Sequence, residues 1–160
     1  MRVANLENEN RKIVSTMGNF HVLEYAKDAS VSPANAAAEY FMGKMGVRRR
    51  QVVIDMNGKD TAIIQAGAMQ WMAGNVQATT GVKGVGDLFG KMVKGVVTKE
   101  SAVKPEYTGS GILVLEPTYK YLILLDVGSW GPQGVTLEDG MFYACSGTVK
   151  NKVVMRSNLS

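Results

Sequence analysis

The sequence is poor in cysteine and histidine. It contains one cysteine, Cys145, and one histidine, His21, among 160 residues. A single cysteine cannot form a disulfide within the chain, so nothing indicates an oxidising compartment. Zinc sites of the Cys/His type need several such ligands, and a Ser–His–Asp or Cys–His arrangement would have to use His21. The sequence therefore predicts no metal site, no cofactor and no enzymatic activity.

Long apolar runs are also absent. The longest notable run, Tyr121–Leu125, has five residues, whereas a membrane-spanning helix needs about 20. The first 20 residues are polar and lack the apolar core of a secretory signal. We therefore expect no membrane span and a cytoplasmic location.

The composition is that of one folded domain. Hydrophobic residues make up 46% of the chain and charged residues 20%, and a chain of this length corresponds to about one domain. We expect a polar N-terminal segment over 1–20, either loose or part of the fold, and a single β-rich domain over 21–160. The formal net charge is +4, which permits an anionic partner without requiring one.

Short runs rich in β-forming residues alternate with glycine-containing turns. Asn57-Gly58 favours a hairpin turn between the first two runs, Met69, Trp71 and Ala73 suit a strand with one buried face, and 121–127 suits a fully buried strand. We expect a mostly β protein, an antiparallel sandwich or barrel with one or two short helices. The expected strands are 51–55, 61–65, 69–73, 112–115, 121–127, 135–137, 141–145 and 148–155.

Two segments have the features of helices. Ser32-Pro33 is a helix-start signal before Asn35–Met42, and Gly43 or Gly46 can end that helix. In Val85–Val96, apolar residues recur at steps of three and four, which predicts an amphipathic helix. The alternative for this second segment is a glycine-rich loop with a single helical turn.

The basic triplet Arg48, Arg49 and Arg50 is the most distinct charge feature. In a strand, Arg48 and Arg50 would point to one face and Arg49 to the other. Guanidinium groups bind phosphate and carboxylate well, so the triplet is a candidate anion or nucleic-acid contact, helped by Lys44. The alternative is a solvated strand start whose arginines pair with Asp or Glu on a neighbouring part of the fold.

No other group of residues points to catalysis. The glycine-rich run 81–91 lacks the spacing of a phosphate-binding loop, because Val85 and Met92 stand where glycine and serine or threonine are needed. His21 has no partner visible in the sequence, and Cys145 lies in an apolar run typical of a buried, unreactive thiol. The carboxylates stand singly or at turns, so we assign no catalytic residue.

Several ordered motifs resemble a known family. Gly67–Val76, the glycine-rich amphipathic segment, Glu100-Ser101 and Tyr107–Pro117 together resemble the altered-inheritance-of-mitochondria family, over about residues 20–155. The resemblance implies the fold of the superfamily named after the tryptophan RNA-binding attenuation protein. It implies no reaction, because the matching motifs consist of glycines and core residues.

The sequence departs from this family pattern toward its end. Thr98–Val103 replaces a Gly-Gly-Glu-Ser-Leu-Phe-like run, and the second half that follows a strand like Met141–Cys145 in the family is missing before Ser160. The chain is then a fragment or a naturally short member. An open sheet edge would favour pairing with another chain, unless a local rearrangement closes it.

Three hypotheses for function follow from these features. The first is a non-enzymatic β-domain that acts through protein–protein contact, most simply as a homo-oligomer. The alternative is an RNA- or anion-binding module that uses the surface of Arg48–Arg50. The third is an enzyme whose site is assembled from carboxylates and lysines across a subunit boundary.

Overall fold

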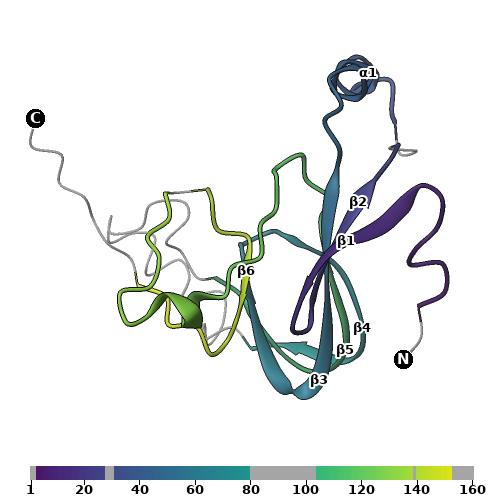
Figure 1. Cartoon of the computed structure of the whole chain (residues 1–160). Helices are drawn as coiled ribbons and strands as arrows, with labels where there is room; N and C mark the ends of the chain where they lie inside the picture. The colour runs from purple at the N-terminus through teal and green to yellow at the C-terminus, as the bar shows by residue number, and fades with distance from the viewer. Residues whose placement is uncertain (1–2, 28–30, 80–103, 139, 153–160) are drawn as a thin grey trace, which may run out of the picture.

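One antiparallel sheet of six strands organises the molecule (Figure 1). The computed structural model describes residues 3–27, 31–79, 104–138 and 140–152. The spatial order of the strands is β1-β2-β3-β5-β4, and β6 pairs with β3. The strands are β1 (Arg11–Met17), β2 (Phe20–Tyr25), β3 (Arg50–Ile64), β4 (Met69–Ala78), β5 (Glu106–Leu115) and β6 (Ala144–Ser146). The mostly β class is confirmed, and among the described residues the sheet does not close into a barrel.

The polar N-terminal segment contains the first strand of this sheet. β1 and β2 form a hairpin in which Met17 pairs with Phe20 and Arg11 with Tyr25. Gly18 lies in the turn with a positive φ of 56°, a conformation that glycine adopts without steric cost. Residues of the 1–20 segment are therefore part of the sheet.

β3 bends sharply instead of forming the expected hairpin. It has 15 residues, and β5 pairs with it on both sides of an irregularity between Asn57 and Thr61. Gly58 lies in this irregularity with φ 85°, so Asn57-Gly58 forms a bulge, and bulges bend strands. The predicted hairpin is wrong because β5 is long enough to pair with both halves of β3. Figure 1 shows β3 turning back on itself at the bottom of the view.

Glycines in β5 allow β4 to approach closely at the bend. A Cβ atom at Gly109 would lie 1.9 Å from the Asn75 carbonyl oxygen, and one at Gly111 would lie 2.0 Å from that of Ala73. Gly111 pairs with Met56 on β3 and with Gly74 on β4. Glycines of β5 and β4 therefore face each other beside the bend, and Gly58 lies within the bend of β3.

The larger part of the core lies inside this bend. Because side chains alternate between the two faces of a strand, Val52 and Ile54 of β3 face the inner cluster and Val53 faces the outer one. Inner residues from both halves of β3 meet Leu113 and Leu115 of β5. The outer cluster of Leu23, Val53, Ile112 and Val114 is covered by Val3, Leu6 and Ile13.

Strand β4 does not have the expected buried face. Met69 is 37% exposed and Trp71 is 39% exposed, while Val76 is the buried residue of this strand. Within the described part of the chain, β4 pairs with β5 alone. The prediction failed because pairing with β5 satisfies main-chain groups of β4 but does not cover its faces, and Met69 and Trp71 stay more than one-third exposed.

The apolar run 121–127 forms no strand. Tyr121 is 75% exposed and Ile123 is 69% exposed, while Leu122 is partly buried and packs against the inner core. The run continues into a short 3-10 helix, η1 (Val127–Trp130). The prediction of a fully buried strand is wrong, because in the described residues no neighbouring strand pairs with it. Residues 135–137 form no strand either, and of the last two expected strands only β6 forms in the described residues.

The first expected helix is present as α1 (Ala36–Lys44), shifted slightly from its prediction. Asn35 occupies the N-cap position, and its side-chain oxygen accepts hydrogen bonds from the backbone N–H of Ser32 (2.7 Å) and from its hydroxyl (3.0 Å). Gly46, with φ 72°, follows the end of the helix. The second expected helix, 85–96, lies outside the described residues.

Candidate functional site

The arginine triplet lies where the chain enters β3 from α1. β3 begins at Arg50, so strand alternation does not extend to Arg48 and Arg49. Arg48 donates a hydrogen bond through Nη1 to the backbone carbonyl of Ala26. The three arginines therefore have different surroundings.

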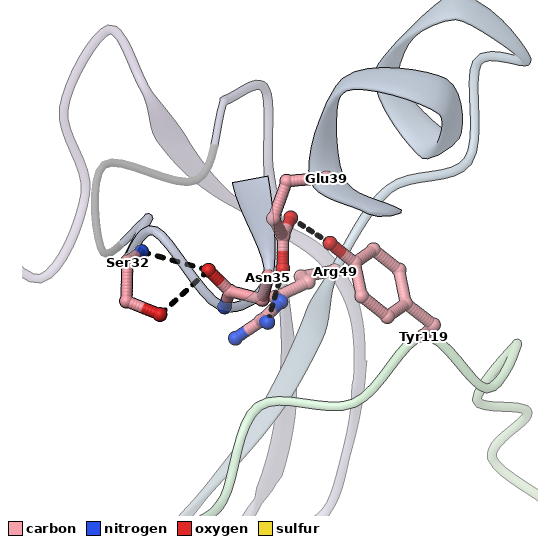
Figure 2. Close-up of polar contacts among 5 residues, drawn as sticks. All are labelled: Ser32, Asn35, Glu39, Arg49 and Tyr119. Atoms are coloured by element: carbon pink, nitrogen blue, oxygen red, sulfur yellow. Dashed lines mark hydrogen bonds and ion pairs between the residues drawn. The ribbon is translucent and has the colours of Figure 1, made fainter. Parts of the chain in front are cut away.

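Arg49 joins α1 to the segment that follows β5 (Figure 2). Its Nη2 lies 2.5 Å from Oε1 of Glu39, a carboxylate on α1 whose side chain is only 9% exposed. The Tyr119 hydroxyl donates a hydrogen bond to the other oxygen of Glu39. The Arg49 guanidinium also lies over the Tyr119 ring, 4.9 Å from its centre. These three side chains form a compact group, here called the Glu39 anchor.

Arg50 is engaged by a neighbouring strand. Its Nη2 forms an ion pair with Oε2 of Glu24, its register partner on β2. Its guanidinium lies 4.1 Å from the centre of the Tyr121 ring. The alternative in which the arginines pair with nearby carboxylates thus describes Arg49 and Arg50.

An open groove of about 500 Å³ separates α1 from the end of β2. Among the described residues, its charged lining consists of Lys27, Lys44, Arg48, Arg49 and one carboxylate, Glu39. Because Arg49 and Tyr119 already occupy both oxygens of Glu39, the described part of this lining is positive. Such a surface attracts anionic groups.

A chain of polar side chains crosses the sheet below this groove. Arg11 of β1 donates to the Tyr25 hydroxyl at 3.2 Å, and that hydroxyl donates to Oε1 of Gln51 at 2.5 Å. Gln51 Nε2 donates to the Leu115 carbonyl (2.9 Å) and to Gln70 (2.8 Å). The chain thus takes one residue from each of β1, β2, β3, β5 and β4.

Gln51 is the buried polar residue of the described core, with 3% exposure. Gln51 begins the predicted strand 51–55, and no role for it follows from the sequence pattern. The signal was an amide side chain directly before the apolar run Val52–Ile54. Buried amides are almost always hydrogen-bonded. This signal could therefore have indicated that Gln51 has hydrogen-bond partners on neighbouring strands.

His21 does have partners in the structure. Its Nε2 lies 3.2 Å from Oδ2 of Asp55, and its Nδ1 lies 3.1 Å from the Thr16 hydroxyl. The order Thr–His–Asp matches a catalytic relay in its residue types. However, Thr16 and His21 are cross-strand partners in a hairpin, and the Asp55 side chain is 63% exposed. The arrangement is that of a surface cross-strand cluster, not of a base held in a cleft.

The surroundings of Cys145 favour the protonated thiol. Burial raises the pKa of the Cys145 thiol, against smaller lowering effects of Asn151 and Lys104. The Asn151 side chain donates a hydrogen bond to Sγ at 3.4 Å. Since the thiolate is the nucleophile, this environment reduces reactivity.

Nearby, burial and then the charge of Glu116 raise the pKa of Tyr143 from its ordinary 10.0 to about 12. The Tyr143 hydroxyl donates to the Glu116 backbone carbonyl. Ionisation of this tyrosine is therefore disfavoured in the folded protein.

The described residues contain neither a metal-binding cluster of His, Cys, Asp or Glu side chains nor a membrane-spanning helix. Over residues 3–27, 31–79, 104–138 and 140–152, His, Cys, Asp and Glu side chains form no group of three that could hold a metal ion. In the same ranges no helix has the length and apolar character needed to cross a membrane.

Neither the curated proteins nor the solved structures contain a match to this sequence. A family model described as mitochondrial biogenesis AIM24 matches residues 44–160, which include β3, β4, β5 and β6. This match confirms the resemblance found in Gly67–Val76 and Tyr107–Pro117, and the chain belongs to the mitochondrial biogenesis AIM24 family.

Proposed function

We propose that this chain is a non-enzymatic β-domain that acts through protein–protein contact, and first through self-association. The observation that carries the proposal is the exposed apolar surface of residues 121–137, here called the apolar arm. Its large apolar side chains that are at least one-third exposed are Tyr121, Ile123, Leu125, Trp130, Val135 and Leu137. These residues are concentrated in one segment of the chain, and contiguous exposed apolar surface marks interaction sites more often than isolated side chains do.

The backbone of the arm supports the same proposal. Exposure alternates along 121–125, with Tyr121, Ile123 and Leu125 exposed and the two residues between them partly buried. Among the described residues, no main-chain hydrogen bond involves 121–125. A segment that carries one apolar row, and whose main chain bonds to no described residue, is suited to strand addition, in which main-chain hydrogen bonds supply affinity and alternate side chains supply specificity.

The test is the molar mass in solution over a wide range of concentrations, measured by size exclusion with light scattering. We expect the wild-type chain to form oligomers and Ile123→Ser to shift the equilibrium toward the monomer. Val14→Ser is the matched control, because Val14 is a 52% exposed apolar residue on β1, outside the arm. A strict monomer at all concentrations would contradict the proposal.

The second candidate, binding of RNA or another anion at Arg48–Arg50, is supported by the basic lining of the groove. It is weakened because Arg49 and Arg50 each face a carboxylate at ion-pair distance. Binding to single-stranded RNA that falls steeply with salt would support it, and no binding at low salt would exclude it. We also propose a cytoplasmic location, consistent with a single cysteine that can form no disulfide within the chain.

A further inference from the structure

We infer that the tip formed by α1 binds the surface of membranes rich in anionic phospholipid. The tip is defined by Tyr40, Phe41, Lys44, Met45 and Arg48. This inference concerns a different surface from the apolar arm and goes beyond the proposed function. It rests on the exposure of the tip, its position in the fold and the charges beside it.

Large apolar side chains on the tip are exposed. Tyr40 is 60% exposed, Phe41 62% and Met45 67%, and none of the residues of α1 is buried. Residues four apart share a helix face, which places Tyr40 beside Lys44 and Phe41 beside Met45. The Lys44 Nζ atom indeed lies 5.4 Å from the centre of the Tyr40 ring. One face of the helix therefore combines apolar and cationic side chains.

The fold holds this face away from the rest of the molecule. Figure 1 shows α1 at the end of the molecule opposite the bend of β3. Glu39, on another side of the helix, is fixed by Arg49 and Tyr119 (Figure 2). The Glu39 anchor therefore attaches α1 to the segments that precede β3 and follow β5, and leaves Tyr40 and Phe41 exposed. A projecting, anchored helix can meet a flat surface without rearrangement of the sheet.

The charges beside the tip suit phosphate headgroups. Lys27, Lys44 and Arg48 are exposed and line the groove next to α1, where the carboxylate of Glu39 is already paired with Arg49. Helices that lie in the membrane interface combine basic residues with inserted aromatic and aliphatic side chains. Anionic lipid attracts each basic residue near the surface. The charge of the tip is therefore complementary to an anionic bilayer.

The same features favour lipid over nucleic acid. A nucleic-acid surface would use the cations but would offer no apolar partner to Met45. The rings of Tyr40 and Phe41 meet edge to face, with centres 5.5 Å apart and planes at 77°. They therefore do not present parallel faces on which successive bases could stack. Insertion into the acyl region removes all three apolar side chains from water at once.

The experiment is cosedimentation of the full chain with vesicles of phosphatidylcholine alone and with vesicles rich in phosphatidylglycerol. We expect binding to the anionic vesicles, which weakens at high salt. Phe41→Ser should weaken binding by about tenfold through lost apolar burial, and Lys44→Gln by about fivefold through lost charge attraction. Val14→Ser, the control on β1, should bind like the wild type. Circular dichroism establishes that each variant is folded.

Insertion of the tip into the bilayer can be measured separately, by tryptophan fluorescence. The emission of a Phe41→Trp variant should shift to the blue when anionic vesicles are added, by more than the emission of the wild-type chain, which already contains Trp71 and Trp130. Equal binding to both kinds of vesicle, no binding to either, or an equal loss in Val14→Ser would overturn the inference. Phosphatidylglycerol vesicles that are displaced by single-stranded RNA, with no blue shift, would assign the tip to nucleic acid instead.

The inference can fail or stand separately from the proposed function. If Ile123→Ser is monomeric and still binds anionic vesicles, the tip acts without self-association. If Phe41→Ser loses vesicle binding but keeps its oligomeric state, the two surfaces are distinct, as we expect. Loss of vesicle binding in Ile123→Ser but not in Phe41→Ser would contradict the inference.

Discussion

The Tyr25 hydroxyl donates a 2.5 Å hydrogen bond to the side-chain oxygen of Gln51, the most deeply buried amide side chain of the described residues. This bond connects β2 to β3 at the end of the sheet that carries α1. Through its amide nitrogen, Gln51 continues the connection to β5 and β4. The two residues thus link the outer hairpin to the bent half of the sheet.

Loss of this bond should lower stability. We expect Gln51→Ala to reduce the free energy of unfolding by about 2–3 kcal/mol, because it leaves the Leu115 carbonyl without its side-chain partner and opens a space in the sheet. Tyr25→Phe should cost about 1 kcal/mol. Urea denaturation of the two single variants and the double variant measures the coupling. Strictly additive effects would show that the two side chains do not act together.

The close approach of β4 and β5 should make stability sensitive to the side chain at position 111. Gly111→Ala should destabilise the protein by at least about 3 kcal/mol, because its Cβ would overlap a backbone oxygen that cannot move alone. Gly43→Ala is the matched control, since nothing lies within 4 Å of a Cβ there. As Gly43 is inside α1, that substitution should be neutral or stabilising by up to about 1 kcal/mol. Equal thermal stability of the two variants would refute the close approach.

The Glu39 anchor should control the attachment of α1. Glu39→Ala removes this carboxylate from Arg49, whose side chain is 23% exposed, so we expect a loss of about 1–3 kcal/mol in the free energy of unfolding. Hydrogen exchange over residues 36–44 should rise most, because the substitution frees the helix from the sheet. Tyr119→Phe keeps the ion pair and should have a smaller effect. Unchanged exchange in both variants would mean that α1 is held by other contacts.

Stability should also depend on pH in the alkaline range. Burial raises the pKa of Tyr143 to about 12 in the folded protein, so unfolding favours ionisation of its hydroxyl. The stabilisation is fully present below pH 10 and is lost as the pH rises toward about 12. Denaturation at a series of pH values should show this decline, and Tyr143→Phe should flatten it. Burial also raises the pKa of Tyr107, so part of the decline should persist in that variant.

Some of this structure could be predicted from local sequence and some could not. The apolar runs at 51–55 and 112–115 correctly predicted strands. They did so because strands in the centre of the sheet are buried on both faces and are therefore apolar throughout. The prediction of a hairpin from Asn57-Gly58 is wrong, because the same dipeptide can form a hairpin turn or a bulge. The choice depends on β5, about 50 residues further on. Local patterns do not contain that information.

The candidate site shows the same limit. The arginine triplet was visible in the sequence, but Glu24 and Glu39 were not identifiable as its partners, because they lie 26 and 10 residues away from the arginines they meet. The apolar character of 121–127 alone predicts a buried strand. Burial also requires a neighbour, and the described chain supplies only a partial one through Leu122. The exposed remainder is the basis of the proposed self-association.

Amide hydrogen exchange of residues 121–125, compared between dilute and concentrated protein, tests that proposal most directly. If a second copy adds a strand to the apolar arm, these amides should exchange at least about tenfold more slowly in concentrated protein, and Ile123→Ser should abolish the difference. Exchange over 121–125 that is fast and identical at both concentrations would contradict the account.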